Sequence, residues 1–174
     1  MPSVREAIQR THRVLESVGI PDARLEAEVI VMNLMRVRRQ DIFANQEVEV
    51  SAQQEADLAR VVERRLKREP LAYILGYREF YGINLLVNSS VMVPRPETEH
   101  LVEAVLALIQ QPQARVADLG TGSGAIALSL ASERPQWQIV ASDISLDALN
   151  VAQHNAAALH LNQVEFRHGS WTGV

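Results

Sequence analysis

The chain has 174 residues, a formal net charge of −4 and 47% hydrophobic residues, which is enough for a globular core. It contains no cysteine, which excludes a disulfide framework and a thiolate zinc site, and no apolar run reaches the ~18 residues expected of a membrane span. The N-terminus lacks an apolar signal region and the acidic balance argues against broad non-specific binding of nucleic acid, so we expect a cytoplasmic protein.

Residues 1–70 are predicted to form a small helical bundle. Ser3 and Ser51 are each followed three residues later by Glu or Gln, which is the pattern of a capping box at a helix start. The helix after Ser3 is expected to stop at Gly19. The helix after Ser51 is expected to stop at Glu69-Pro70, because the residue before a proline avoids helical backbone.

A second helix is expected between these two, with Asp22 as its N-cap and Met35 near its end. Its buried positions are expected to include Leu25, Val29, Met32 and Leu34. A short helix is expected near 41–43. The bundle carries no evident chemistry, and we expect it to recognise or position a partner. Its basic cluster is either a solvated helix face or a docking surface for an acidic or ribonucleoprotein-associated partner; the cluster comprises Arg60, Arg64, Arg65, Lys67 and Arg68.

Residues 71–93 are predicted to form a β-hairpin linker. Gly82 separates two runs of β-favouring residues, 77–81 and 84–87, whose aromatic side chains are expected to pack rather than to contact a substrate. A stiff loop follows: Val93-Pro94-Arg95-Pro96-Glu97-Thr98-Glu99. Its prolines restrict the backbone around Arg95, and its acids suit the positive end of the helix expected next. A rigid arginine followed by acids suggests a binding role for Arg95 and Glu97.

Residues 94–174 predict the order β-α-β-α-β, with strands near 116–119, 137–143 and 164–167. This is the first half of a doubly wound sheet, so the fold class is α/β. Ligands of such sheets bind at the carboxyl ends of the strands. The residues expected there are the glycine loop at 120–124, Asp143 after the second strand and Trp171 after the third.

The glycine loop has the spacing Gly-x-Gly-x-Gly rather than the Gly-x-Gly-x-x-Gly of dinucleotide sites. Asp118 precedes it, and a carboxylate pointing into the crevice opposes a pyrophosphate but suits a ligand with an ammonium and a sulfonium. This favours S-adenosylmethionine over NAD. Asp143 lies about 20 residues further on, where a carboxylate can accept ribose hydroxyls, and Trp171 can offer a face to adenine. A helix-leading role for Asp143 and a core position for Trp171 remain open alternatives.

The segment Asp118-Leu119-Gly120-Thr121-Gly122-Ser123-Gly124-Ala125-Ile126-Ala127-Leu128 resembles motif I of seven-strand S-adenosylmethionine methyltransferases. Together with the Pro-Arg-Pro-Glu-Thr-Glu loop and Arg78-Glu79-Phe80-Tyr81-Gly82, it makes the whole chain resemble the HemK/PrmC family. Those enzymes methylate the side-chain amide of the glutamine in the Gly-Gly-Gln motif of class I peptide chain release factors. The resemblance therefore implies such partners, a Rossmann-like sheet, and no need for a membrane or for direct nucleic-acid contact.

The resemblance also implies roles for single residues. Asp143 would hold the ribose, Trp171 would lie beside the adenine, and the Arg95 loop would help to shape the methyl-acceptor site. The loop lining the methionine part of S-adenosylmethionine would consist of Gly120, Thr121, Gly122, Ser123 and Gly124.

One family feature is missing. The family carries an Asn-Pro-Pro-Tyr motif after the fourth strand, where it binds the acceptor amide, and this motif does not occur among the 174 residues. We therefore name no catalytic residue, expect the chain to be the N-terminal part of a longer enzyme, and expect no methyl transfer by these residues alone. Two alternatives stay open: an amino-group methyltransferase acting on nucleic-acid bases, and a non-catalytic binding module.

Overall fold

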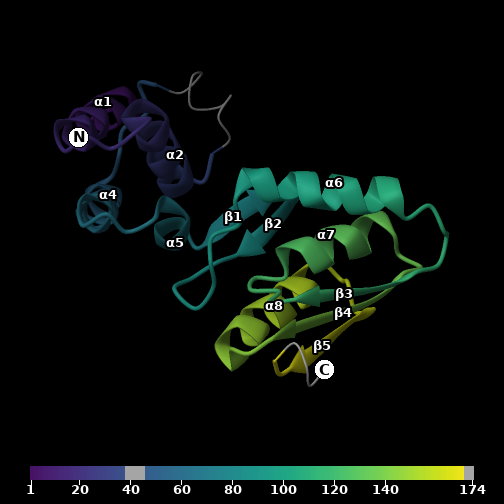
Figure 1. Ribbon diagram of the computed structural model, residues 1–174. Coiled ribbons are helices and arrows are strands. Elements are labelled where there is room, and N and C mark those ends of the chain that lie inside the picture. Colours follow the sequence, from purple (N-terminus) through teal and green to yellow (C-terminus); the bar gives the residue numbers. More distant parts are fainter. Residues whose placement is uncertain (38–45, 171–174) are drawn as a thin grey trace. The chain divides into compact units, whose positions relative to one another are not determined.

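The computed structural model describes residues 1–37 and 46–170, and the chain divides into two compact units, Met1–Leu75 and Gly76–Val174 (Figure 1). The helix expected near 41–43 lies outside the described residues. The hairpin expected as a linker is part of the second unit. The domain bounds 1–70, 71–93 and 94–174 stay a prediction.

The first unit contains α1 (Val4–Ser17), α2 (Ala23–Met35), α4 (Ala52–Leu66) and α5 (Leu71–Leu75). Both expected capping boxes are confirmed: each serine hydroxyl accepts the backbone N–H three residues on, and that residue's side chain accepts the N–H of the serine. The buried side chains of the unit form one apolar cluster, which includes Ala7, Leu15, Ala27, Ile30, Val31 and Leu58.

Two expectations for α2 are wrong. Asp22 has a left-handed backbone with φ of 53°, and its side chain makes no capping hydrogen bond. A capping side chain needs an extended backbone to reach the next N–H groups, and this conformation does not provide it. Leu25 is 48% exposed. It lies two positions from both Ala23 and Ala27, which are buried, and residues two apart face opposite sides of a helix.

The helix α4 ends at Leu66, before the Glu69-Pro70 pair that was expected to stop it. Arg68 has a left-handed backbone, with φ of 66°, which is incompatible with a continuing helix. Its guanidinium donates to the carbonyls of Val18 and Gly19 at the end of α1. The end of α4 therefore coincides with a contact between Arg68 and the end of α1, and Pro70 lies further along the chain.

The basic cluster of α4 is engaged within the chain. Arg65 forms a two-point ion pair with Glu26 of α2, in which both side chains are largely buried. The cations of Arg60, Arg64 and Lys67 pair with acids on the same segment, namely Asp57, Glu69 and Glu63. These contacts favour the interpretation of the cluster as an ordinary, internally compensated helix surface.

The second unit begins with the antiparallel hairpin of β1 (Tyr77–Phe80) and β2 (Ile83–Leu86). Its two turn residues, Tyr81 and Gly82, have φ of 48° and 73°. Two positive φ values at a two-residue turn match the right-handed twist of a hairpin. Phe80 and Leu85 are buried, which confirms packing as a role of the aromatic Phe80.

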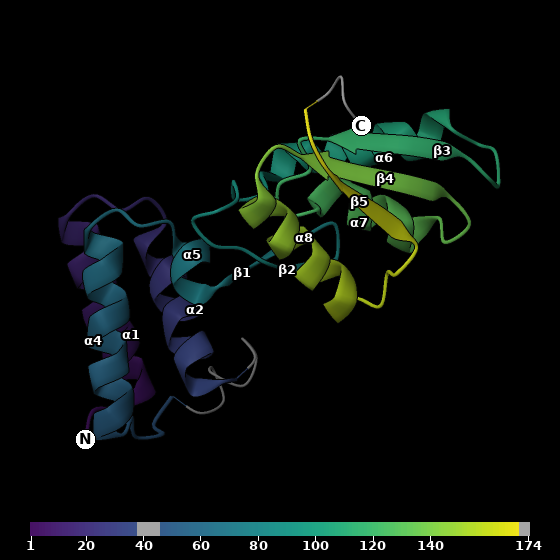
Figure 2. The same ribbon diagram turned by 90° about the horizontal axis from the view of Figure 1, so that it is seen from below.

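The rest of the second unit has the predicted order. Short 3-10 helix η1 (Pro96–Thr98) leads into α6 (Glu99–Leu108), followed by the β-α-β-α-β series. The series consists of β3 (Arg115–Leu119), α7 (Ala125–Glu133), β4 (Gln138–Asp143), α8 (Leu146–Ala158) and β5 (Val164–His168). The strands are parallel in the order β3-β4-β5, so β4 is central, as Figure 2 shows.

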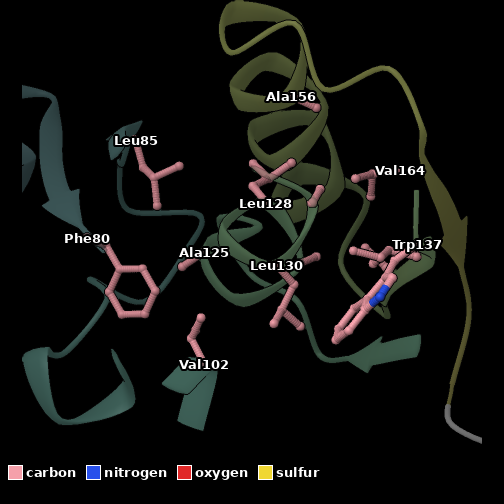
Figure 3. Packing of buried hydrophobic residues seen from close by; sticks show 13 residues of the cluster. Phe80, Leu85, Val102, Ala125, Leu128, Leu130, Trp137, Ala156 and Val164 are labelled. Atoms are coloured by element: carbon pink, nitrogen blue, oxygen red, sulfur yellow. The ribbon is translucent and has the colours of Figure 1, made fainter. Parts of the chain in front are cut away.

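The core of this unit lies on one face of the sheet. On this face, Ile139 of the central strand pairs with Val116 and Val164 of its neighbours, and Ala141 pairs with Phe166. All five side chains belong to the apolar cluster of the unit. The helices α6, α7 and α8 supply the rest of that cluster. Figure 3 shows Leu128 and Leu130 of α7 at its centre. This packing holds α7 and α8 against the sheet, with the glycine loop between β3 and α7.

No helix within 1–37 and 46–170 has both the length and the apolar character needed to span a membrane.

Candidate functional site

The glycine loop joins the end of β3 to the start of α7. Gly120, Gly122 and Gly124 have φ of 80°, 57° and 83°, a region that residues with a Cβ rarely adopt. The N–H groups of Gly120 and Thr121 donate to the carbonyl of Ser142 on β4, at 2.8 and 2.9 Å. The loop is therefore folded back over the end of the central strand.

The side chain of Asp118 holds the glycine loop through hydrogen bonds. Its Oδ2 accepts the hydroxyl of Thr121 at 2.7 Å and the N–H of Ala127, in the first turn of α7, at 3.3 Å. Burial raises the pKa of Asp118 above its ordinary value; these two hydrogen bonds counteract the rise, and the nearby Asp143 adds to it. The sequence suggested a carboxylate pointing into the crevice, whereas the structure uses it to hold the loop and helix together.

Replacing Asp118 by Asn is expected to reduce the pH dependence of stability. A raised pKa means that the folded protein binds the proton more tightly than the unfolded chain does. The wild-type free energy of unfolding therefore falls as pH rises from about 3.9, the ordinary aspartate value, through the raised pKa. The Asn variant keeps an oxygen for Thr121 and Ala127 but loses no proton.

Urea unfolding of both proteins at several pH values between 4 and 7 measures this effect. The wild-type protein should lose more stability across that interval than the D118N variant. Equal losses would mean that the carboxyl of Asp118 titrates alike in the folded and unfolded states.

Asp143 lies at the end of β4 and contacts the same loop. Its Oδ2 accepts the N–H of Gly122 at 2.9 Å, and its Oδ1 accepts the N–H of Ser145 at 2.9 Å. Each carboxylate oxygen has two lone pairs, so both can accept a further donor. The side chain is thus anchored while keeping capacity for a ligand hydroxyl.

A pocket of about 430 Å³ lies beside the loop. One wall comes from the stiff loop and consists of Met92, Val93, Pro94, Arg95 and Thr98; the other consists of Gly120, Thr121, Gly122, Ser123, Ala125 and Ile126. The structure therefore brings Arg95 and four of the five loop residues to one cavity, although they are about 25 positions apart in sequence.

The remaining expected site residues lie elsewhere or outside the description. Gly124, Asp118, Asp143 and Glu97 are not among the residues that line this pocket. Glu97 is exposed on η1. Trp171 lies outside the described residues, so its place beside a purine stays a prediction.

Sequence reasoning did not foresee the contacts or exposure of three residues near the site, namely Glu99, Ile144 and Asn155. Glu99 accepts the N–H of Tyr81 at 3.0 Å and so ties the hairpin turn to the start of α6. Ile144 follows Asp143 and is 74% exposed. Asn155 of α8 is buried and bonds to the residue before the last loop glycine. Two of them carried a signal in the sequence. Ile144 is an apolar residue directly after an acid at a strand end, and Asn155 is a lone polar residue on the buried face of a helix.

Comparison with known proteins matches both units. Residues 6–76 match the PrmC N-terminal domain, and residues 97–172 match the methyltransferase small domain. The release factor glutamine methyltransferase of Coxiella burnetii is 44% identical over 172 residues, which is 98% of this chain and 62% of the relative. That of Neisseria gonorrhoeae is 49% identical over 85% of this chain and 54% of the relative.

The chain thus spans roughly three fifths of the length of the curated relatives it matches. Solved structures resemble it only partly. Trm5b from Pyrococcus abyssi has a TM-score of 0.48 at 19% identity, covering 56% of this chain and 29% of that one. The tRNA (uracil-54, C5)-methyltransferase of Pyrococcus abyssi has a TM-score of 0.47 at 18% identity, with 56% and 24% covered. These similarities are too low to support any statement about substrate.

The two matched domains follow each other in the chain with the helices, hairpin and parallel strands described above. Similarity to release factor glutamine methyltransferases extends through both of them at 38–49% identity. The chain thus carries a PrmC N-terminal domain followed by a methyltransferase small domain, and along most of its length it is similar to release factor glutamine methyltransferases.

Proposed function

We propose that the protein containing this chain transfers a methyl group from S-adenosylmethionine to the side-chain amide of the glutamine in the Gly-Gly-Gln motif of class I peptide chain release factors. The observation that carries this proposal is the 44% identity over 98% of the chain to a relative named release factor glutamine methyltransferase. A cytoplasmic location, and a helical bundle that positions the release factor, accompany it as predictions.

The charge and the apolar surface of the site fit S-adenosylmethionine. Two carboxylates lie close together, Asp118 and Asp143, and the charge of Asp143 contributes to the raised pKa of Asp118. No ion pair to either is found among residues 1–37 and 46–170. Uncompensated negative charge disfavours a phosphate and suits the ammonium and sulfonium of S-adenosylmethionine. The apolar part of the pocket lining suits the uncharged parts of such a molecule.

We infer separate tasks for the residues around the pocket. Asp143 is proposed to accept the ribose hydroxyls and Asp118 to hold the loop and bias the site towards a cation. Ile144 and Trp171 are proposed to offer apolar surface to the adenine. The methionine part would lie along the glycine loop, formed by Gly120, Thr121, Gly122, Ser123 and Gly124.

The second wall is proposed to shape the acceptor side of the site. Pro94 and Pro96 restrict the backbone on both sides of Arg95, so the loop can hold its form without a ligand. When bound, S-adenosylmethionine would supply an activated methyl group. An amide nitrogen is a poor nucleophile, so what the protein must provide is close and oriented placement of that nitrogen.

The test uses the protein expressed from its complete reading frame, S-adenosylmethionine labelled in its methyl group, and a purified class I release factor. Label is expected in the peptide that contains Gly-Gly-Gln, and peptide mapping locates it. A release factor whose glutamine in that motif is replaced by alanine serves as the control and should take up none.

Label at another side chain, or in nucleic acid offered in parallel, would contradict the proposed substrate. Cofactor binding without any methyl transfer would favour a non-catalytic binding module. The same assay run on residues 1–174 alone tests the prediction that this segment transfers no methyl group.

A further inference from the structure

Asn155 makes three hydrogen bonds from a buried position on α8. Only 2% of its surface is exposed. Its Oδ1 accepts the N–H of Leu86 at 2.7 Å, and its Nδ2 donates to the carbonyls of Leu86 at 3.1 Å and of Ser123 at 2.9 Å. Both amide protons are therefore used, and the side chain bridges β2 and the glycine loop.

This bridge connects the two walls of the pocket. Ser123 lies on the glycine-loop wall, and Leu86 ends the strand from which the chain runs on to Met92 and the stiff wall. At the other end of that wall, Glu99 accepts the N–H of Tyr81 in the same hairpin. The wall that contains Arg95 is thus connected to the hairpin at both of its ends, and Asn155 connects the hairpin to the glycine loop.

The chemistry at this position is specific to an amide. One face of the side chain must accept a hydrogen bond while the other donates two, which only the carboxamide of Asn or Gln provides among uncharged side chains. A leucine would leave the N–H of Leu86 and the carbonyls of Leu86 and Ser123 without this partner. An aspartate would place a second oxygen against two carbonyl oxygens, which repel it.

We propose that Asn155 is a positioning residue that holds the glycine loop in register with the stiff loop and thereby sets the affinity of the pocket for the cofactor. The identity of that cofactor rests on the proposed function. Asn155 lines no part of the pocket itself, so its effect is transmitted through the carbonyl of Ser123 and the backbone of Leu86.

The experiment compares S-adenosylhomocysteine affinity, measured by calorimetry on the protein from its complete reading frame, between wild type and N155D and N155L. Both variants are expected to bind at least tenfold more weakly. In N155D the loss should shrink as pH falls, because a protonated carboxyl regains one donor. A residue that only filled space would show no such pH dependence.

Two controls separate positioning from general weakening of the fold. V164A removes buried apolar volume from β5, and Q163L removes a side-chain amide donor that bonds to the carbonyl of Ala131 on α7. Neither residue lines the pocket beside the glycine loop. Both control variants are expected to bind within twofold of wild type at a temperature at which circular dichroism shows them folded.

Asn155 variants that bind within twofold of wild type would overturn the inference, as would a V164A loss equal to theirs. Should N155D not fold, N155S supplies the comparison, because its hydroxyl has one proton and can donate to only one of the two carbonyls. If wild type itself binds no S-adenosylhomocysteine, the proposed function fails instead. Hydrogen exchange at the loop amides 122–124 then tests the positioning role without a ligand, and faster exchange is expected in the Asn155 variants only.

Discussion

Replacing Asp143 by alanine is expected to weaken binding of S-adenosylhomocysteine by about 10- to 100-fold. Asp143 is half-buried, and loss of a hydrogen-bonded carboxylate costs roughly 1–3 kcal/mol. The Ala variant loses the proposed ribose acceptor, and it also releases the N–H groups of Gly122 and Ser145 that the carboxylate holds. Cofactor affinity and loop order should therefore fall together.

Calorimetry on the protein from its complete reading frame measures the affinity. D143N keeps one oxygen that can accept a hydrogen bond, so its loss is expected to be smaller than that of D143A. D147A removes an acid of the first turn of α8 that is exposed, and it controls for the change in net charge. If D147A weakened binding as strongly as D143A, the effect would be one of charge rather than of direct contact.

Replacing Gly124 by alanine is expected to lower the free energy of unfolding by about 2–5 kcal/mol. The residue has φ of 83° at the start of α7, which costs about 1–2 kcal/mol for a residue with a Cβ. An added Cβ would also lie 2.9 Å from Cδ1 of Leu128 and 3.3 Å from the Cβ of Ala152. Leu128 is fully buried, so overpacking adds roughly 1–3 kcal/mol.

Gly120 offers a matched control because its φ of 80° is nearly the same, but an added Cβ there meets no atom within 4 Å. G120A is therefore expected to lose only about 1–2 kcal/mol, the cost of the backbone conformation. Urea unfolding of the two variants gives the difference. Equal losses would show that a Cβ at position 124 causes no overpacking against Leu128 and Ala152.

These two predictions concern one structural arrangement. Gly124 lets the start of α7 lie close to α8, and Asp143 holds the middle of the same loop through Gly122. The third glycine thus serves helix packing, whereas Gly120 and Gly122 line the pocket. Variants at these positions should therefore separate stability from ligand binding: Gly124 mainly affects the first and Asp143 mainly the second.

Local signals predicted the elements well and their tertiary details poorly. The capping boxes at Ser3 and Ser51 involve residues within three positions, so the sequence contains all that they require. Asp22 failed as a cap because its backbone conformation is left-handed. The end of α4 was misplaced: the helix stops at Leu66, and the left-handed Arg68 beyond it contacts Val18 and Gly19, about 50 residues away.

The sequence by itself determined the β-α-β-α-β order, the glycine loop at the end of the first strand and the place of Asp143 at the end of the second. Apolar runs, glycines and capping residues encode these through local backbone preferences. Only the tertiary structure decided that Arg95 lies across a pocket from Gly122 and that Asn155 bridges the hairpin to Ser123. Such contacts depend on which distant segments packing brings together, and no local pattern specifies them.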